Sequence, residues 1–437
     1  MGVVDREQLQ QLSKDELIDR FLDLQSKLGL PRKTSKTSSL PPSSDKKARR
    51  LNSKPGGAKP GHKPFHRSIS TTPDETVDYN PEACQHCGSA FSGDETQEVI
   101  KTYEQIDLPP ITPHIVHHRR LACVCAGCGA KTKAPAPAAA IGSPFGPGIA
   151  SLAVYLKHFQ LFSYERLQGI FKDVFGVKIS EGALTNMLAR SAKAFTPGYQ
   201  AALDILHKAK AVASDETGLR IEGTNAWRWI FKSMGAVVHV ADYSRASRVI
   251  DETMNGHKPD YWLSDRYSAQ QNKGHRHQTC LAHLARDIAR IMEVGDQKIA
   301  KKLKAWMDDV FTLSREIHAL TRKVIDTRTQ TLQVRVDKLL KWNGPCPQTW
   351  KVVRKMKNAS DQLLTFTSAP HLVEATNNGS EREIRPSVIE NKVTNGHRSK
   401  SGADNDCKIK TVVNTAKLSG QNPYQTIRTP WGLEAQA

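Results

Sequence analysis

Residues 211–217 determine the fold class that we predict. They read Ala-Val-Ala-Ser-Asp-Glu-Thr, an apolar run that ends in an acid, and the pattern then alternates through Ile221. Three more strand-like runs and one helix are predicted downstream, at 227–233, 236–241, 245–254 (the helix) and 261–264. Asp265 follows the last run. Acids on the first and fourth strands of this order indicate a ribonuclease-H-like fold, in which the rim of the sheet presents the carboxylates.

A third acid lies in residues 376–386, Thr-Asn-Asn-Gly-Ser-Glu-Arg-Glu-Ile-Arg-Pro. The two asparagines offer an N-cap for a helix that starts near Gly379, with Glu381 in its first turn. Glu383 is a rival third acid, but two positions along a helix it points to another face. A single acid at a strand end is usually a turn residue or a helix cap. Three converging carboxylates, Asp215, Asp265 and Glu381, would instead hold two Mg²⁺ ions for phosphoryl transfer.

Three strings carry a resemblance to the insertion sequence 66 family of bacterial DDE transposases: Asp215-Glu216-Thr217, Cys280-Leu281-Ala282-His283, and residues 377–382 with Arg385-Pro386. The last string is the most specific, although it has Ser380 and Ile384 where the family commonly has Ala and Leu. The resemblance implies metal-dependent DNA strand cleavage and strand transfer of an insertion sequence. It favours Glu381 as the third acid and an active-site role for His283. It implies that the chain acts on terminal inverted repeats and target DNA, as a homo-oligomer and with accessory proteins encoded by the same element.

The residues that we expect to contact DNA lie in two regions. Around the third acid, Arg382 and Arg385 would meet DNA phosphates, and Asn377 and Asn378 would lie beside them. The other region is a helical segment. Ser163 and Ser180 can cap helices over 164–175 and 181–195, which gives a helix-turn-helix-like pair that exposes Thr185, Asn186 and Arg190. Any helical hairpin has a similar pattern, so DNA contact in this second region stays an open alternative.

The composition favours a polyanionic partner. The chain has 437 residues, and 63 Lys and Arg against 44 Asp and Glu give a net charge of +19. No apolar run reaches the length that spans a membrane, and the N-terminus lacks a signal-peptide core. We therefore expect a cytoplasmic, nucleoid-associated bacterial protein.

The cysteines predict one structural zinc site. Cys84 and Cys87 form one Cys-x-x-Cys pair and Cys125 and Cys128 form another, and each pair is followed by Gly. Two such knuckles close a tetrahedral four-thiolate site that leaves no position open for catalysis. Cys123 also has near-neighbour spacing to Cys125, but it matches the first knuckle less well. Strand-like pieces near 99–100 and 114–117 would form a small sheet between the pairs.

The predicted architecture is α/β and multidomain. An amphipathic helix over 5–29 is followed by a linker over 32–67 with eleven Lys and Arg against one acid, either a tether or an arm that tracks DNA phosphates. The 116 residues between Asp265 and Glu381 predict a helical insertion, with one long helix through 303–324 and another over 350–366. A C-terminal helix would pack beside the catalytic core. The expected domains are 1–30, 31–75, 76–135 (zinc), 145–200 (helical), 205–395 (catalytic, with an insertion over about 295–370) and 396–437.

Two other functions fit parts of the sequence. A zinc-containing, sequence-specific DNA-binding regulator would use the zinc and helical domains without catalysis. A nuclease or resolvase of the same fold would cut DNA without joining it. The three intact acids argue against the regulator.

Overall fold

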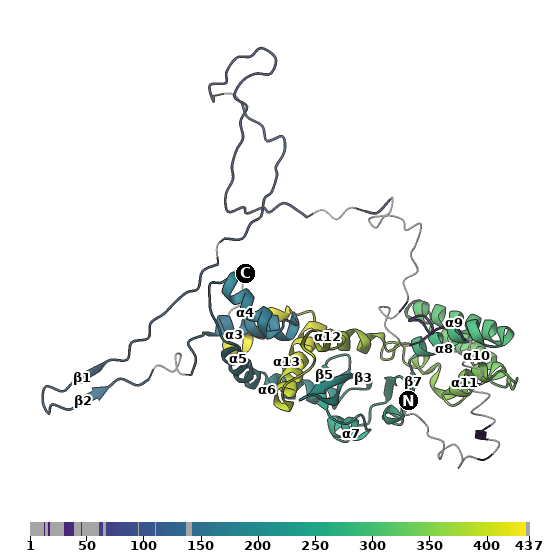
Figure 1. Ribbon diagram of the computed structural model, residues 1–437. Helices are drawn as coiled ribbons and strands as arrows, with labels where there is room; N and C mark the ends of the chain where they lie inside the picture. Colours follow the sequence, from purple (N-terminus) through teal and green to yellow (C-terminus); the bar gives the residue numbers. More distant parts are fainter. Residues whose placement is uncertain are drawn as a thin grey trace. The chain divides into compact units, whose positions relative to one another are not determined.

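In a computed structural model of the protein, the described residues are 13, 16–17, 30–38, 45, 61–63, 67–94, 96–109, 111–136 and 142–433 (Figure 1). Apart from residues 13, 16 and 17, the predicted helix over 5–29 lies outside these residues, as does much of the basic linker. No helix among the described residues is long and apolar enough to cross a membrane.

The chain divides into two compact units, residues 47–114 and residues 1–46 with 115–437. The pieces near 99–100 and 114–117, which we predicted to be strands, form none. A two-stranded antiparallel sheet lies instead around the second cysteine pair, between β1 (Ala122–Val124) and β2 (Lys131–Lys133). The reason is local: the tight turn at Cys125–Gly129 brings its own flanking residues into register.

The main sheet has five strands in the order β5-β4-β3-β6-β7. Strands β3, β4 and β5 pair antiparallel, whereas β3, β6 and β7 pair parallel. The bounds are β3 Ala211–Ile221, β4 Thr224–Lys232, β5 Val237–Asp242, β6 Tyr261–Ser264 and β7 Arg276–Thr279. These bounds confirm the four predicted strands. The fifth strand, β7, ends at Thr279, and Cys280 to His283 lie at the start of the helix that follows.

Helices cover both faces of this sheet. On one face, α6 (Thr196–Leu206) and α7 (Arg248–Met254) pack against alternate side chains of the strands, among them Val212, Trp229 and Trp262. On the other face, α12 (Asn378–Thr394) packs on β3 and β4, and α13 (Lys400–Leu418) packs along β5. The predicted C-terminal helix beside the core is therefore confirmed. The result is a three-layer arrangement that fixes α12 over the strands that carry the acids.

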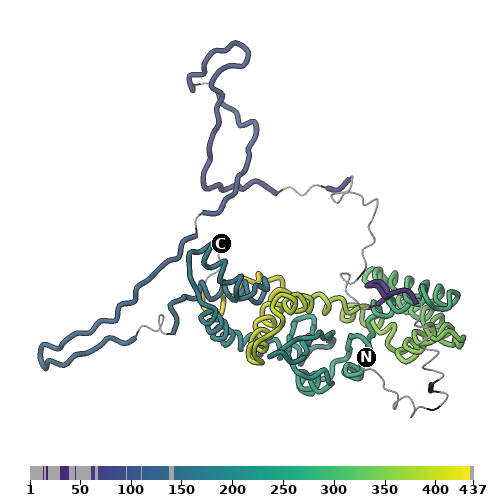
Figure 2. Tube along the Cα trace, in the orientation of Figure 1, coloured from purple at the N-terminus to yellow at the C-terminus, as the bar shows by residue number. Residues whose placement is uncertain are grey.

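A helical region precedes the sheet. It consists of α3 (Pro147–Val154), a π-helical turn (Tyr155–Phe159), α4 (Tyr164–Asp173) and α5 (Glu181–Ala194). The predicted caps are confirmed, since the hydroxyls of Ser163 and Ser180 accept hydrogen bonds from the backbone N–H groups of Arg166 and Ala183. Its core also takes in residues of α13 and of α14 (Pro423–Arg428). Figure 2 shows these late residues, in yellow, beside the blue helices.

The insertion is helical, as predicted, but its helices are shorter than expected. After α8 (Leu281–Val294), the stripe over 303–324 is divided between α9 (Gln297–Glu316) and α10 (Arg322–Leu339). The two pack antiparallel, and the Trp306 indole donates to the Leu332 carbonyl at 2.9 Å. The stripe stays buried as far as Ile317, but on α10 Val324 is exposed and Ile325 is buried in its place, because both helices bury apolar residues in one core. Helix α11 (Pro347–Lys357) ends well before Phe366, which lies in a 3₁₀ turn.

A buried ionic network connects β4, α12, α13 and the π-helical turn. Asp406 contacts Arg228 at 2.6 Å, His158 at 2.7 Å and Lys410 at 3.0 Å. Glu390 pairs with Lys410 and, at 3.7 Å, with Lys157. All these residues are at most 9% exposed. Removing any one partner would leave a buried charge without compensation.

Candidate active site

The parallel pairing of β3 and β6 places two acids at matching positions. The last paired residues are Ala213 and Leu263, and Asp215 and Asp265 each lie two residues further along. Since side chains alternate along a strand, both acids share the face that α12 covers. Asp215 lies inside the long strand β3, and not at a strand end as we expected. It nevertheless marks the end of the parallel part of the sheet.

The third acid comes from the first turn of α12. The Glu381 N–H donates to the Asn377 carbonyl at 3.1 Å, which opens the helix. One Glu381 carboxylate oxygen lies 3.9 Å from Nδ1 of His283, in the first turn of α8. Burial and then the nearby Arg286 lower the pKa of His283. The structure thus brings His283 and Glu381 together, although they are 98 positions apart in the sequence.

Asn377 connects the two halves of the site. It occupies the N-cap position, but its side chain makes no capping hydrogen bond. Its Nδ2 instead donates to the carbonyl of Ser214 at 2.8 Å, and its backbone N–H lies 3.1 Å from the Cys280 sulfur. Asn377 is only 2% exposed, which does not suit the direct DNA contact that we expected of it. Its contacts suit the positioning of α12 against the strand that carries Asp215.

A set of polar residues that we did not predict from the sequence lies beside the acids. The buried carboxylate of Glu216 accepts from Arg245 Nε at 3.0 Å and also from Gln270. The Arg245 guanidinium lies over the rings of Trp227 and Tyr267, 4.6 and 4.0 Å from their centroids. The backbone N–H of Tyr267 donates to Asp265 at 2.8 Å. The only signal in the sequence was the adjacent acid pair Asp215-Glu216, because the partners are 29 and 54 positions away from Glu216.

The electrostatics of the site fit a cation. Burial raises the pKa of Asp215 to about 8, and the carboxylates of Glu216, Glu381 and Asp265 act in the same direction. When burial and neighbouring negative charges destabilise the ionised form of a carboxyl group, a bound hard cation stabilises it again. The oxygen donors of Asp215, Asp265 and Glu381 therefore fit Mg²⁺.

The raised pKa of Asp215 predicts a pH-dependent effect on stability in the absence of metal. The Asp215 carboxyl binds its proton more tightly in the folded state than in the unfolded state. Its ionisation therefore lowers the free energy of unfolding as pH rises from about 4 to about 8. In EDTA at pH 8, Asp215→Asn should raise the free energy of unfolding by about 2 kcal/mol, less than the full linkage value because the side chain is not fully buried. The gain should vanish near pH 4. Urea unfolding across this pH range measures it.

Asp260→Asn is the matched control for this experiment. Asp260 is an exposed acid at the opposite end of β6, so its replacement should change stability little at any pH. Mg²⁺ should stabilise the wild type but not Asp215→Asn. An Asp215→Asn gain that is the same at pH 4 and pH 8 would contradict the prediction.

Among the described residues, two groups place three potential metal ligands together. The ligand atoms of Cys280, His283 and Glu381 lie within 4.8 Å of one another, but burial raises the pKa of the Cys280 thiol, which opposes metal binding. The other group is Glu390, His397 and Asp406. Its carboxylates already pair with the lysines and the arginine of the ionic network, so it needs no metal.

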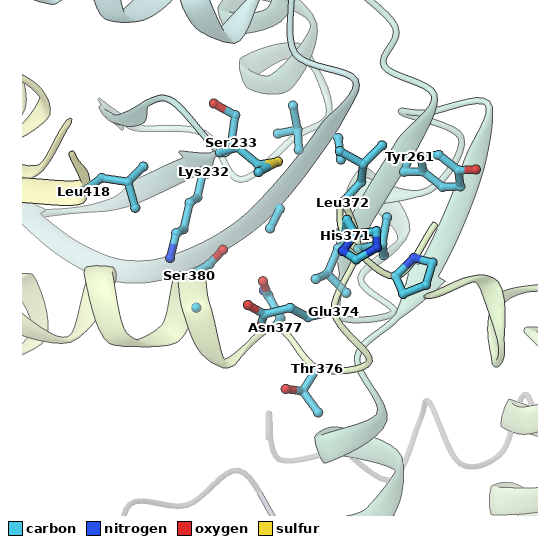
Figure 3. A pocket seen from close by; sticks show the side chains of 18 of the residues that line it. Lys232, Ser233, Tyr261, His371, Leu372, Glu374, Thr376, Asn377, Ser380 and Leu418 are labelled. Atoms are coloured by element: carbon cyan, nitrogen blue, oxygen red, sulfur yellow. The ribbon is translucent and has the colours of Figure 1, made fainter. Parts of the chain in front are cut away.

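A pocket of about 360 Å³ adjoins the start of α12. Figure 3 shows Lys232, Glu374, Asn377 and Ser380 around it, with the Lys232 ammonium directed toward the helix. Apolar residues of β3 and β6 form another wall. Asn377, Gly379 and Ser380 of the helix start line this pocket, whereas Glu381 does not.

The other residues that we expect to contact DNA are exposed. On α12, Asn378, Arg382 and Arg385 face solvent. The same is true of Thr185, Asn186 and Arg190 on α5. This accessibility is required for DNA contact, which stays a prediction for all six.

The two cysteine pairs have the same local geometry, each within its own unit of the chain. In the first, Gly88 N–H donates to the Cys84 carbonyl at 2.9 Å; in the second, Gly129 N–H donates to the Cys125 carbonyl at 2.9 Å. Both glycines have positive φ, 73° and 69°. A hydrogen bond with Ser89 lowers the pKa of Cys87 to about 7, and backbone N–H groups, first that of Gly127, lower the pKa of Cys125. Turns that favour thiolates fit zinc.

Comparison with known families gives one match. Residues 142–405 match the model of the family described as Transposase IS66 family. The match spans the helical region, the sheet, the insertion and α12, and so includes all three acids. No curated protein matches the chain.

Proposed function

Because this chain belongs to the IS66 family of transposases, we propose that it cleaves DNA at the ends of an insertion sequence and joins those ends to target DNA. The observation that supports the proposal is that Asp215 and Asp265 follow matching positions of β3 and β6, while burial and the carboxylates of Glu216, Glu381 and Asp265 destabilise Asp215 as a carboxylate. The strand order and the position of the acids support a ribonuclease-H-like catalytic domain.

In the proposed mechanism the three carboxylates hold two Mg²⁺ ions, which when bound would stabilise the attacking and leaving oxygens of the phosphoryl transfer. Asp265 is oriented by the Tyr267 N–H, and the start of α12, which carries Glu381, is tied to β3 by Asn377. His283 lies beside Glu381, where it orients that carboxylate or contacts the scissile phosphate. Arg245 and Gln270 bind Glu216, the neighbour of Asp215 on β3, so that Glu216 adds no free carboxylate to the site.

DNA reaches this site over exposed cationic surface. Asn378, Arg382 and Arg385 lie on the first two turns of α12, within two turns of Glu381. Thr185, Asn186 and Arg190 would contact DNA from α5. A multimer that bridges two DNA ends, with accessory proteins of the same element, completes the proposal.

The test uses DNA that carries the terminal repeats flanking this protein's own gene, with Mg²⁺, the wild type and Asp265→Asn. Cleavage and joining by the wild type alone are expected. Nicking without joining would favour a nuclease or resolvase. Binding without cleavage by both proteins, even after the neighbouring gene products are added, would favour the DNA-binding regulator and overturn the proposal.

We also propose one structural zinc ion on Cys84, Cys87, Cys125 and Cys128. The purified full chain should contain about one zinc per molecule by elemental analysis, because two knuckles complete one tetrahedral site. Cys84→Ser and Cys128→Ser should each lose it. Cys123→Ser is the control and should retain it. Loss of zinc in Cys123→Ser with retention in Cys128→Ser would show that the ligand set is wrong.

A further inference from the structure

A second pocket, of about 280 Å³, lies where α12, α13 and the π-helical turn meet. It is on a different flank of α12 from Glu381, since Arg382 and Glu383 follow Glu381 around the helix. Its lining comes from three separate parts of the chain: His158 and Phe159; Arg382, Glu383, Pro386 and Ser387; and Lys410, Asn414 and Lys417, with His239 at the sheet.

The charge around this pocket is positive. Arg382, Lys410 and Lys417 line it against one carboxylate, that of Glu383. Lys410 belongs to the buried network, where three cations face two carboxylates and leave one excess positive charge when the histidines are neutral. The Lys417 ammonium lies 5.9 Å from the centroid of the Phe159 ring at the pocket wall. An anion is the ligand that this arrangement favours.

Three buried polar atoms of the lining have no hydrogen-bond partner within the part of the chain that the structure describes. They are Nε2 of His158, whose side chain is 9% exposed, Nδ1 of the fully buried His239, and Oγ of Ser387, which is 1% exposed. Lys410 and Arg228, against the opposing effect of burial, hold the pKa of Asp406 well below its ordinary value. Asp406 is therefore a carboxylate that accepts from Nδ1 of His158, which leaves Nε2 of His158 as an acceptor at the pocket wall. A buried polar group of this kind indicates a missing partner.

We propose that this pocket receives one phosphate of the DNA backbone, which accepts a hydrogen bond from the Ser387 hydroxyl and is neutralised by Arg382 and Lys417. The inference rests on the proposed function, because DNA is the polyanion on which the chain acts. A strand held here runs past the flank of α12 next to Glu381. The α3–α5 region, α12 and the C-terminal segment would then hold the same strand.

The experiment measures DNA binding by the full chain in EDTA, so that no strand is cut, as a function of KCl concentration. Lys417→Gln should lower the slope of log affinity against log salt by about 0.9, the value for one phosphate contact. Lys304→Gln is the matched control, because it removes the same charge from an exposed lysine that already pairs with Asp308. Ser387→Ala should weaken binding about three- to tenfold. Glu383→Gln should strengthen it, since it removes the only carboxylate in the lining.

Methylphosphonate substitution along the strand identifies the phosphate. A methylphosphonate at one position should lower the DNA affinity of the wild type, and the same substitution should have little further effect on the affinity of Lys417→Gln. The inference is overturned if Lys417→Gln and Ser387→Ala behave as Lys304→Gln does, or if no position shows this dependence. If inorganic phosphate alone raises the melting temperature of the wild type but not of Lys417→Gln, and no methylphosphonate position matters, the pocket binds free phosphate and the DNA assignment is wrong. The proposed function is tested separately, by measuring the cleavage of terminal-repeat DNA in Mg²⁺.

Discussion

Glu381→Gln should reduce the rate of strand cleavage by about a thousandfold, while the affinity for terminal-repeat DNA changes by less than about threefold. The substitution keeps the size of the side chain and removes the charge that would bind metal. Glu381 is one-third exposed, and its neighbours on α12 carry the packing, so the fold should persist. Single-turnover cleavage at saturating DNA and Mg²⁺ gives the rate, and gel-shift titration in EDTA gives the affinity.

Asp260→Asn serves as the control for the cleavage rate, because it neutralises an acid on the same sheet but at the far end of β6. It should cleave as fast as the wild type. If Glu381→Gln retains more than about a tenth of the wild-type rate, Glu381 is not the third acid and the assignment must move to its neighbour Glu383.

Asp406→Ala should destabilise the protein by about 3–5 kcal/mol, the largest effect on stability that we expect from any single residue. Asp406 is 1% exposed and contacts Arg228, which is fully buried, and Lys410. Without the carboxylate, two buried cations lose their compensation, and the α3–α5 region, α12 and α13 lose a shared contact. Chemical unfolding followed by circular dichroism measures the change.

Asp404→Ala is the matched control for Asp406→Ala. Asp404 lies on the same helix and pairs with Lys400, but both side chains are largely exposed, so its loss should cost less than about 1 kcal/mol. If Asp406→Ala does not fold, Asp406→Asn keeps the shape and tests the charge alone. Equal stability of Asp406→Asn and the wild type would show that the network contributes by hydrogen bonding and not by charge.

The strands and helices that depend on a local residue pattern could be predicted from the sequence. The alternation and apolar runs in 211–264 predicted four strands and the two acids that two of them present. Ser163 and Ser180 predicted helix starts because a hydroxyl at the N-cap bonds to the adjacent backbone. Glu381 was also placed correctly in a first helical turn, although the Asn377 side chain at the N-cap makes no capping hydrogen bond.

The tertiary structure alone decided which distant residues meet. Asn377 bonds to Ser214, Arg228 pairs with Asp406, and His158 lines a pocket with Ser387, across 163, 178 and 229 positions. The periodicity of apolar residues indicates whether a side chain is buried. It does not indicate which residue that side chain contacts, because the contact depends on the order of the strands and on how the helices cross them. The same limit explains the insertion: the apolar pattern from Leu303 to Ile317 correctly predicted a buried face, whereas Val324 is exposed beyond the break between α9 and α10, which arises from the packing of both helices in one shared core.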